Sequence, residues 1–139
     1  MSDTMRAALD DGNGIVSIHR SPMPERFPGS ALIAMKQIGI CGGDLHMNNE
    51  RTVPQTLPSG HEPAGEVIGV PPGEVRIQPG DRVAIEATGS GKACEACYFC
   101  RTGQYPHCID MAEESGGAFA EYMTRTPLGL HKLSDNMSW

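Results

Sequence analysis

The sequence contains the stretch Cys94-Glu95-Ala96-Cys97-Tyr98-Phe99-Cys100, followed by Cys108, so four thiols lie within fifteen positions. Short Cys-x-x-Cys spacings let a tight loop surround a zinc ion, which takes four sulfur ligands at about 2.3 Å. Disulfides are disfavoured, because neighbouring Cys-x-x-Cys bridges are usually redox-active and nothing in the sequence indicates secretion. Four unrelated core cysteines are also disfavoured, since loop-forming residues surround them: Gly91, Lys92, Glu95, Arg101, Thr102, Gly103 and Gln104. We therefore predict a structural zinc site in a four-cysteine lobe spanning residues 89–108.

A zinc site with four cysteine ligands has no open position, so it holds a loop in shape and any chemistry must come from elsewhere. The fifth cysteine, Cys41, stands apart from the lobe and, like His46, His61 and Glu62, lies at a glycine-rich strand end. Cysteine and histidine suit zinc, and Glu62 would either bind the ion or lie just behind it. The residues alone leave this second site open, because a lone buried cysteine and a hydrogen-bonded core histidine are commoner than a ligand pair.

Length and composition narrow the class of protein. A chain of 139 residues is expected to form one domain, residues 1–139, with a real core. The formal charge is -6, and the eleven basic residues are scattered, which argues against nucleic acid or an anionic membrane as a partner. No run approaches the roughly 20 apolar residues that span a bilayer. Five cysteines without a signal stretch favour a reducing, cytoplasmic location.

Turn residues divide the chain into short strands. Proline and glycine clusters recur every ten residues or so, and the segments between them are typical of a mainly β, barrel-like domain with little helix. In the expected strand over 31–40, Leu32 and Ile38 would lie on one face and Met35 on the other. The polar segment 47–59 reads as a loop, and Asp135 or Asn136 would cap a helix beginning near the end of the chain. The expected strands are 5–9, 15–20, 31–40, 66–70, 82–87, 119–124 and 129–133.

Separated motifs in this sequence resemble, in order and spacing, those of the zinc-dependent medium-chain alcohol dehydrogenases. The resemblance extends from about Met5 to Trp139, and the segment 129–139 looks most like the polyol branch, the sorbitol, xylitol and arabinitol dehydrogenases. The motifs are Gly39-Ile40-Cys41-Gly42-x-Asp44-x-His46, Gly60-His61-Glu62-x-x-Gly65-x-Val67, Gly80-Asp81-Arg82-Val83 and Cys94-x2-Cys97-x2-Cys100-x7-Cys108.

The resemblance implies a fold and a role for each motif residue. The fold would be a GroES-like, partly open β-barrel, and Cys94, Cys97, Cys100 and Cys108 would bind structural zinc. Cys41 and His61 would bind catalytic zinc, with Glu62 a ligand or a close neighbour. Asp44 would hydrogen-bond a ligating imidazole, and His46 would be the outer member of a proton relay. An alcohol or polyol would be ionised to its alkoxide at zinc, and hydride would pass to NAD or NADP.

The sequence departs from the family pattern in three respects. Gly43 replaces the usual Ser or Thr, so the proton relay would run through water or the activity would be reduced. A third family ligand would lie beyond residue 139. The family's Rossmann domain is not found, because Gly89-Ser90-Gly91 is followed by Cys94 where a third glycine belongs. We therefore expect a domain truncated at its C-terminal end and inactive as an isolated chain.

Two hypotheses about the function remain. The first is the zinc-binding catalytic part of an NAD(P)-dependent alcohol or polyol dehydrogenase, with a small-molecule substrate and a homo-oligomeric full-length form. A simple secondary alcohol or the hydroxyl of an amino acid is a further candidate substrate. The second is a stand-alone zinc-binding or protein-interaction module built on the four-cysteine lobe, which would leave the motifs around Cys41 and His61 unexplained.

Overall fold

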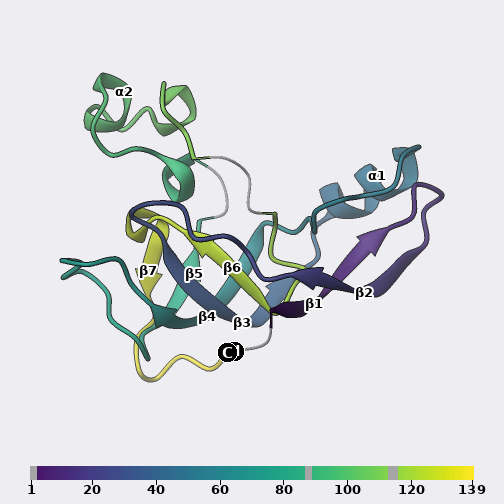
Figure 1. The fold of residues 1–139 in the computed structure, drawn as a ribbon, viewed down its shortest axis with the longest axis horizontal. Helices are drawn as coiled ribbons and strands as arrows, with labels where there is room; N and C mark the ends of the chain where they lie inside the picture. The colour runs from purple at the N-terminus through teal and green to yellow at the C-terminus, as the bar shows by residue number, and fades with distance from the viewer. Residues whose placement is uncertain (1–2, 87–88, 113–115) are drawn as a thin grey trace.

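The computed structural model describes residues 3–86, 89–112 and 116–139, and β-strands dominate it (Figure 1). Strands β1 (Thr4–Asp10) and β2 (Val16–Pro22) form an antiparallel hairpin. The main sheet has five strands in the order β6-β3-β4-β5-β7, and each neighbouring pair is antiparallel. These strands are β3 (Ala31–Gly39), β4 (Glu62–Gly69), β5 (Arg82–Ile85), β6 (Tyr122–Arg125) and β7 (Leu130–Lys132).

The hydrophobic core lies on one face of the main sheet. Ile33 on β3 is fully buried and pairs directly with Val67 on β4 and Met123 on β6, which are also fully buried. Val83 on β5 and Ile77 in the preceding loop extend the same cluster. Burial of such side chains contributes about 1.5–3 kcal/mol each, so these positions hold the sheet together.

The hairpin joins the main sheet through the segment that precedes β6. The backbone N–H of Ala8 donates to the carbonyl of Phe119 at 2.8 Å, and that of Glu121 donates to the carbonyl of Arg6 at 3.0 Å. Apart from these few bonds, the hairpin and the five-stranded sheet remain two sheets among the described residues and do not close into a barrel. This confirms the predicted partly open, mainly β domain.

All seven expected strands are present, with shifted ends. The strand expected over 82–87 ends at Ile85, and Ala87 lies outside the described residues. The strand expected over 66–70 begins earlier, at Glu62. The expected alternation along β3 is wrong beyond Met35, because an extra residue interrupts its register with β4. Met35 and Ile38 consequently both pack against the core.

Two expectations are wrong: part of the loop expected over 47–59 is helical, and the helix expected near the end of the chain is a turn. Helix α1 (Gly42–Glu50) occupies part of the expected loop, and a capping box made by Cys41 and Asp44 starts it. None of its residues is buried, so no apolar periodicity marked it in the sequence. The expected C-terminal helix is a turn at Asp135-Asn136, and the chain then folds back until Trp139 lies over the guanidinium of Arg82 at 4.4 Å.

Short helices complete the fold around the four-cysteine lobe, which projects from one end of the sheet, while α1 and the hairpin lie at the other end (Figure 1). In the described parts of the chain, no helix is long and apolar enough to cross a membrane. The short helices are η1 (Gly89–Lys92), α2 (Tyr98–Arg101), η2 (Tyr105–His107) and η3 (Pro127–Gly129).

Candidate metal centres

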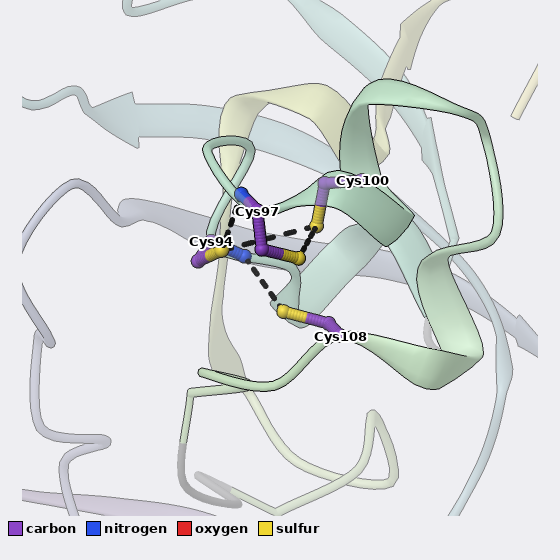
Figure 2. A group of neighbouring side chains, drawn as sticks. All are labelled: Cys94, Cys97, Cys100 and Cys108. Atoms are coloured by element: carbon purple, nitrogen blue, oxygen red, sulfur yellow. Dashed lines mark hydrogen bonds between the residues drawn. The ribbon is translucent and has the colours of Figure 1, made fainter.

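The four cysteines of the lobe point their sulfur atoms toward one another (Figure 2). The Cys94 and Cys100 sulfurs are 3.9 Å apart and those of Cys97 and Cys100 3.5 Å, and all four lie within 4.8 Å of one another. A tetrahedron with bonds of about 2.3 Å has sulfur–sulfur edges of roughly 3.8 Å. The cluster therefore has the ligand type, number and spacing that zinc requires.

Backbone hydrogen bonds and burial prepare these thiols unequally for a metal. A backbone hydrogen bond from Cys100, then one from Ile109, lowers the pKa of Cys97 to about 6. A backbone hydrogen bond from Cys94 also lowers the pKa of Cys108, whereas burial raises the pKa of Cys100 to about 12. Since thiolates bind zinc, the hydrogen bonds at Cys97 and Cys108 shift these two residues toward the binding form, whereas burial shifts Cys100 toward the thiol.

The local sequence explains how the lobe closes. Cys97 ends the first Cys-x-x-Cys loop and caps the single turn of α2, where the backbone N–H of Arg101 donates to its carbonyl at 3.0 Å. Gly103 then reverses the chain with a φ of 77°, a conformation that glycine adopts without strain. Pro106 lies in η2, which delivers Cys108 back to the cluster.

The lobe is attached to the sheet where two short helices meet. A Cβ added to Gly129 in η3 would lie only 2.5 Å from the Cα of Gly91 in η1, so two backbones touch there without side chains. The N–H of Thr126 also donates to the carbonyl of Gly91 at 3.0 Å. Gly89-Ser90-Gly91 thus belongs to a 3-10 helix at the base of the lobe, and within the described residues it opens no strand–loop–helix unit.

A second group of ligand-type side chains meets between β3 and β4. Cys41 follows β3 and caps α1, His61 precedes β4, and Glu62 begins that strand. The Cys41 Sγ is 3.1 Å from the His61 Nε2, and one ligand atom from each of the three residues lies within 4.8 Å of the others. Ideal zinc geometry would place that sulfur and nitrogen roughly 3.6 Å apart. We call this Cys41, His61 and Glu62 group the open site.

Asp44 contacts two residues of the open site, Cys41 and His61. Its Oδ2 accepts a hydrogen bond of 3.0 Å from the backbone N–H of Cys41, and its Oδ1 lies 3.5 Å from the His61 Nδ1. The Asp44 side chain is only 7% exposed, so this carboxylate is fixed behind the imidazole. The His61 ring is thereby turned with Nε2 toward Cys41, as a metal ligand requires.

Two glycines make room for the open site. A Cβ on Gly39 would overlap a carboxylate oxygen of Glu62, so glycine allows Glu62 to lie across the end of β3. A Cβ on Gly43 would lie 3.2 Å from the Cys41 Sγ, which shows that a hydroxyl-bearing residue there would sit beside the sulfur. The role of Gly39 was missed in the sequence, because only the placement of Glu62 gives it one.

His46 is not brought to the open site. It lies on the exposed surface of α1, where its Nε2 is 3.3 Å from the Glu50 Oε1, one helical turn away. His61 faces a cavity of about 740 Å³ between the four-cysteine lobe and the segment after α1. Met47, Pro58 and Met111 are among the residues that line this cavity. Arg51 and Lys92 line it as well, so a molecule approaching His61 would meet both apolar and cationic side chains.

An antiparallel β domain that carries a four-cysteine group and a separate Cys-His-Glu group is what the motif resemblance implies for a zinc-binding domain of a dehydrogenase. The family model described as "Alcohol dehydrogenase GroES-like domain" matches residues 27–135. The chain belongs to this family and, with it, to the zinc-dependent medium-chain alcohol dehydrogenases.

Individual relatives agree with this assignment. L-threonine 3-dehydrogenase from Francisella philomiragia is 36% identical over 141 residues, covering 95% of this chain and 39% of the relative. Alcohol dehydrogenase TADH from Thermus sp. ATN1 has a TM-score of 0.77 and 31% identity, covering 96% of this chain and 41% of that structure. Galactitol-1-phosphate dehydrogenase from Escherichia coli has a TM-score of 0.74 and 28% identity, covering 96% of this chain and 39% of that structure. The chain thus spans about two fifths of each.

Proposed function

We propose that this chain is the zinc-binding catalytic domain of an NAD(P)-dependent dehydrogenase that oxidises a secondary alcohol, with polyols among the candidates, to a ketone. The observation that carries the proposal is the convergence of Cys41, His61 and Glu62, with His61 lining a cavity of about 740 Å³. Relatives named L-threonine 3-dehydrogenase and galactitol-1-phosphate dehydrogenase support a hydroxyl-bearing substrate.

Cys41, His61 and Glu62 would hold the catalytic zinc. The chemistry that zinc supplies when bound is a lower hydroxyl pKa, about 7 in place of about 16 for free water. That difference of some nine units corresponds to roughly 12 kcal/mol of ionisation cost at pH 7. The donor set fits the ion, because it combines a thiol, an imidazole and a carboxylate on facing strand ends.

The residues around the ligands orient them. Asp44, whose Oδ1 lies 3.5 Å from the His61 Nδ1, would orient the imidazole so that its Nε2 faces Cys41. The N–H of Gly43 donates to the Cys41 Sγ at 3.1 Å and fixes the position of the sulfur. Both contacts hold the ligands in place before a metal arrives.

The proton released from the alcohol leaves through water in this proposal. Gly43 carries no hydroxyl, and the exposed His46 contacts Glu50, with 3.3 Å between its Nε2 and the Glu50 Oε1. The cavity beside His61 is large enough for several water molecules. NAD or NADP would supply the acceptor for the hydride of the alcohol carbon, so that the product would be a ketone.

Zinc content tests the proposal directly. We expect two zinc ions per wild-type chain and one in Cys41→Ser, with His61→Ala behaving like Cys41→Ser. The matched control is Cys97→Ser, which should remove the other zinc and leave the open site occupied. Cobalt substitution separates the two sites by the intensity of their thiolate charge-transfer bands. A single zinc throughout, lost only on changing Cys97, would overturn the proposal and favour a purely structural module.

The isolated 139-residue chain should form no NADH from alcohols and added NAD. The reason is that no dinucleotide-binding strand–loop–helix unit occurs in the described residues. Appreciable turnover by the purified chain, measured at 340 nm, would contradict this part of the proposal without affecting the metal assignment.

A further inference from the structure

Glu95, the residue after Cys94, has a left-handed backbone conformation. Its φ of 60° makes it the only non-glycine residue with a positive φ in the described parts of the chain. For a residue with a Cβ this conformation costs about 1–2 kcal/mol, so glycine is the residue expected in such a turn. A side-chain contact that stabilises the turn would offset part of this cost.

The side chain of Glu95 is held by an arginine from another part of the fold. The Arg76 Nη1 donates to the Glu95 Oε2 at 3.1 Å. Glu74 fixes the same guanidinium, because its Oε1 accepts from the Arg76 Nε at 3.1 Å and its Oε2 accepts from Nη2 at 3.0 Å. The Glu74 side chain is only 6% exposed, and its hydrogen bonds from Arg76 lower its pKa, so the pair is charged at neutral pH.

This contact joins the four-cysteine lobe to the hydrophobic core. Arg76 lies in the loop between β4 and β5, and its neighbour Ile77 is 3% exposed in the core cluster. Glu95 lies between two cysteines, and the backbone N–H of Cys97 donates to the Cys94 Sγ at 3.4 Å. The guanidinium therefore connects a loop anchored in the core by Ile77 to the turn between the first two cysteines of the lobe.

We propose that Arg76 is a positioning residue for the four-cysteine site, which holds the Glu95 turn closed around the bound metal. To release the metal, the turn from Cys94 to Cys97 must open, and Glu95 must leave the guanidinium as it does so. The pair thus slows metal release. The inference requires a metal in the four-cysteine site alone and is independent of the open site and of dehydrogenase activity.

The expected effects are differences in the rate of metal release. Arg76→Ala should accelerate release about two- to fivefold, as expected for a partly exposed ion pair worth up to about 1 kcal/mol. Glu95→Gly removes the pair and the unfavourable φ together, so its release rate should be near that of the parent. In the Glu95→Gly background, Arg76→Ala should change the rate less than about 1.5-fold, because the pair no longer exists.

The experiment measures zinc transfer to a chromophoric chelator by stopped flow, with every variant carrying Cys41→Ser so that only the four-cysteine site contributes. Arg101→Ala is the matched control, since it removes an exposed arginine from the same lobe. Should Arg76→Ala not fold by circular dichroism, Arg76→Lys keeps the charge, loses the forked contact and should accelerate release in the same direction. The proposal is overturned if Arg76→Ala matches Arg101→Ala, or if it accelerates release equally with Glu95 and with glycine at position 95.

Discussion

Replacing Gly12 by alanine tests how tightly the hairpin holds the segment after α1. Gly12 has a φ of 83°, and a Cβ there would lie 2.7 Å from the carbonyl carbon of Val53 and 2.8 Å from the nitrogen of Pro54. Gly73 has nearly the same φ, 79°, with nothing within 4 Å of an added Cβ. The two glycines therefore differ in steric surroundings but share their backbone conformation.

The pair of variants separates the backbone cost from the steric cost. Alanine in the left-handed region costs about 1–2 kcal/mol, which is all that Gly73→Ala should lose. Gly12→Ala should lose a further 1–3 kcal/mol or so, because the atoms it would overlap are backbone and cannot turn aside. The entropy that alanine removes from the unfolded chain is the same for both and cancels in the difference.

Urea denaturation of the zinc-loaded variants, followed by circular dichroism, gives the free energy of unfolding that each substitution removes. Thermal unfolding of the same variants gives their melting temperatures. For a domain of this size, 1 kcal/mol corresponds to about 3–5 °C in melting temperature, so the variants should melt some 3–15 °C apart. Equal losses would refute the reasoning, since they would mean that the Val53-Pro54 backbone moves away at no cost.

Three further predictions concern the metal sites and acid stability. Gly39→Ala should displace the Glu62 carboxylate and weaken zinc binding at the open site about tenfold or more. Gly42→Ala is the control and should leave zinc binding unchanged, because nothing lies within 4 Å of its added Cβ. Competition titration with cobalt compares the affinities of the two variants. Strong chelators should unfold the four-cysteine lobe, because structural zinc contributes on the order of 10 kcal/mol to small folds, and unchanged protease resistance there after EDTA treatment would contradict this. A hydrogen bond from Lys132 lowers the pKa of Asp81, so its stabilisation is present above about pH 4 and lost as pH falls through the lower folded value. Asp81→Asn should therefore lose stability at pH 6 but little at pH 2, and an equal loss at both would exclude the ion pair as the cause.

The four-cysteine lobe could be predicted from sequence because its information is local. Cys94, Cys97 and Cys100 follow one another at a spacing that few other structures use, and Cys108 is close enough to return through a single turn. The strands were found for a similar reason, since proline and glycine mark their ends. The register of β3 could not be predicted in the same way, because its extra residue is recognised only from the pairing of β3 with β4.

The open site needed more than local spacing. Cys41 and His61 are twenty residues apart, and only the pairing of Gly39 with Glu62 across β3 and β4 brings them together. Physical reasoning from the residues left that site undecided, and the family motifs supplied the expectation. Helix α1 was missed because its stability comes from the Cys41 and Asp44 capping box rather than from an apolar face. The assignment of the chain to the polyol branch stays a prediction.

The extra residue in β3 has a consequence for how this domain tolerates deletions. Lys36 is the position at which two residues of β3 oppose one of β4. Removing Lys36 alone would leave Gln37 opposite Ala64 and Gly39 opposite Glu62, so the side chains beyond it would keep their faces. The domain should therefore tolerate a one-residue deletion at this point of the strand. A second deletion, with no extra residue left to absorb it, would turn the following side chains over and bring the thiol of Cys41 out on the face opposite its imidazole partner.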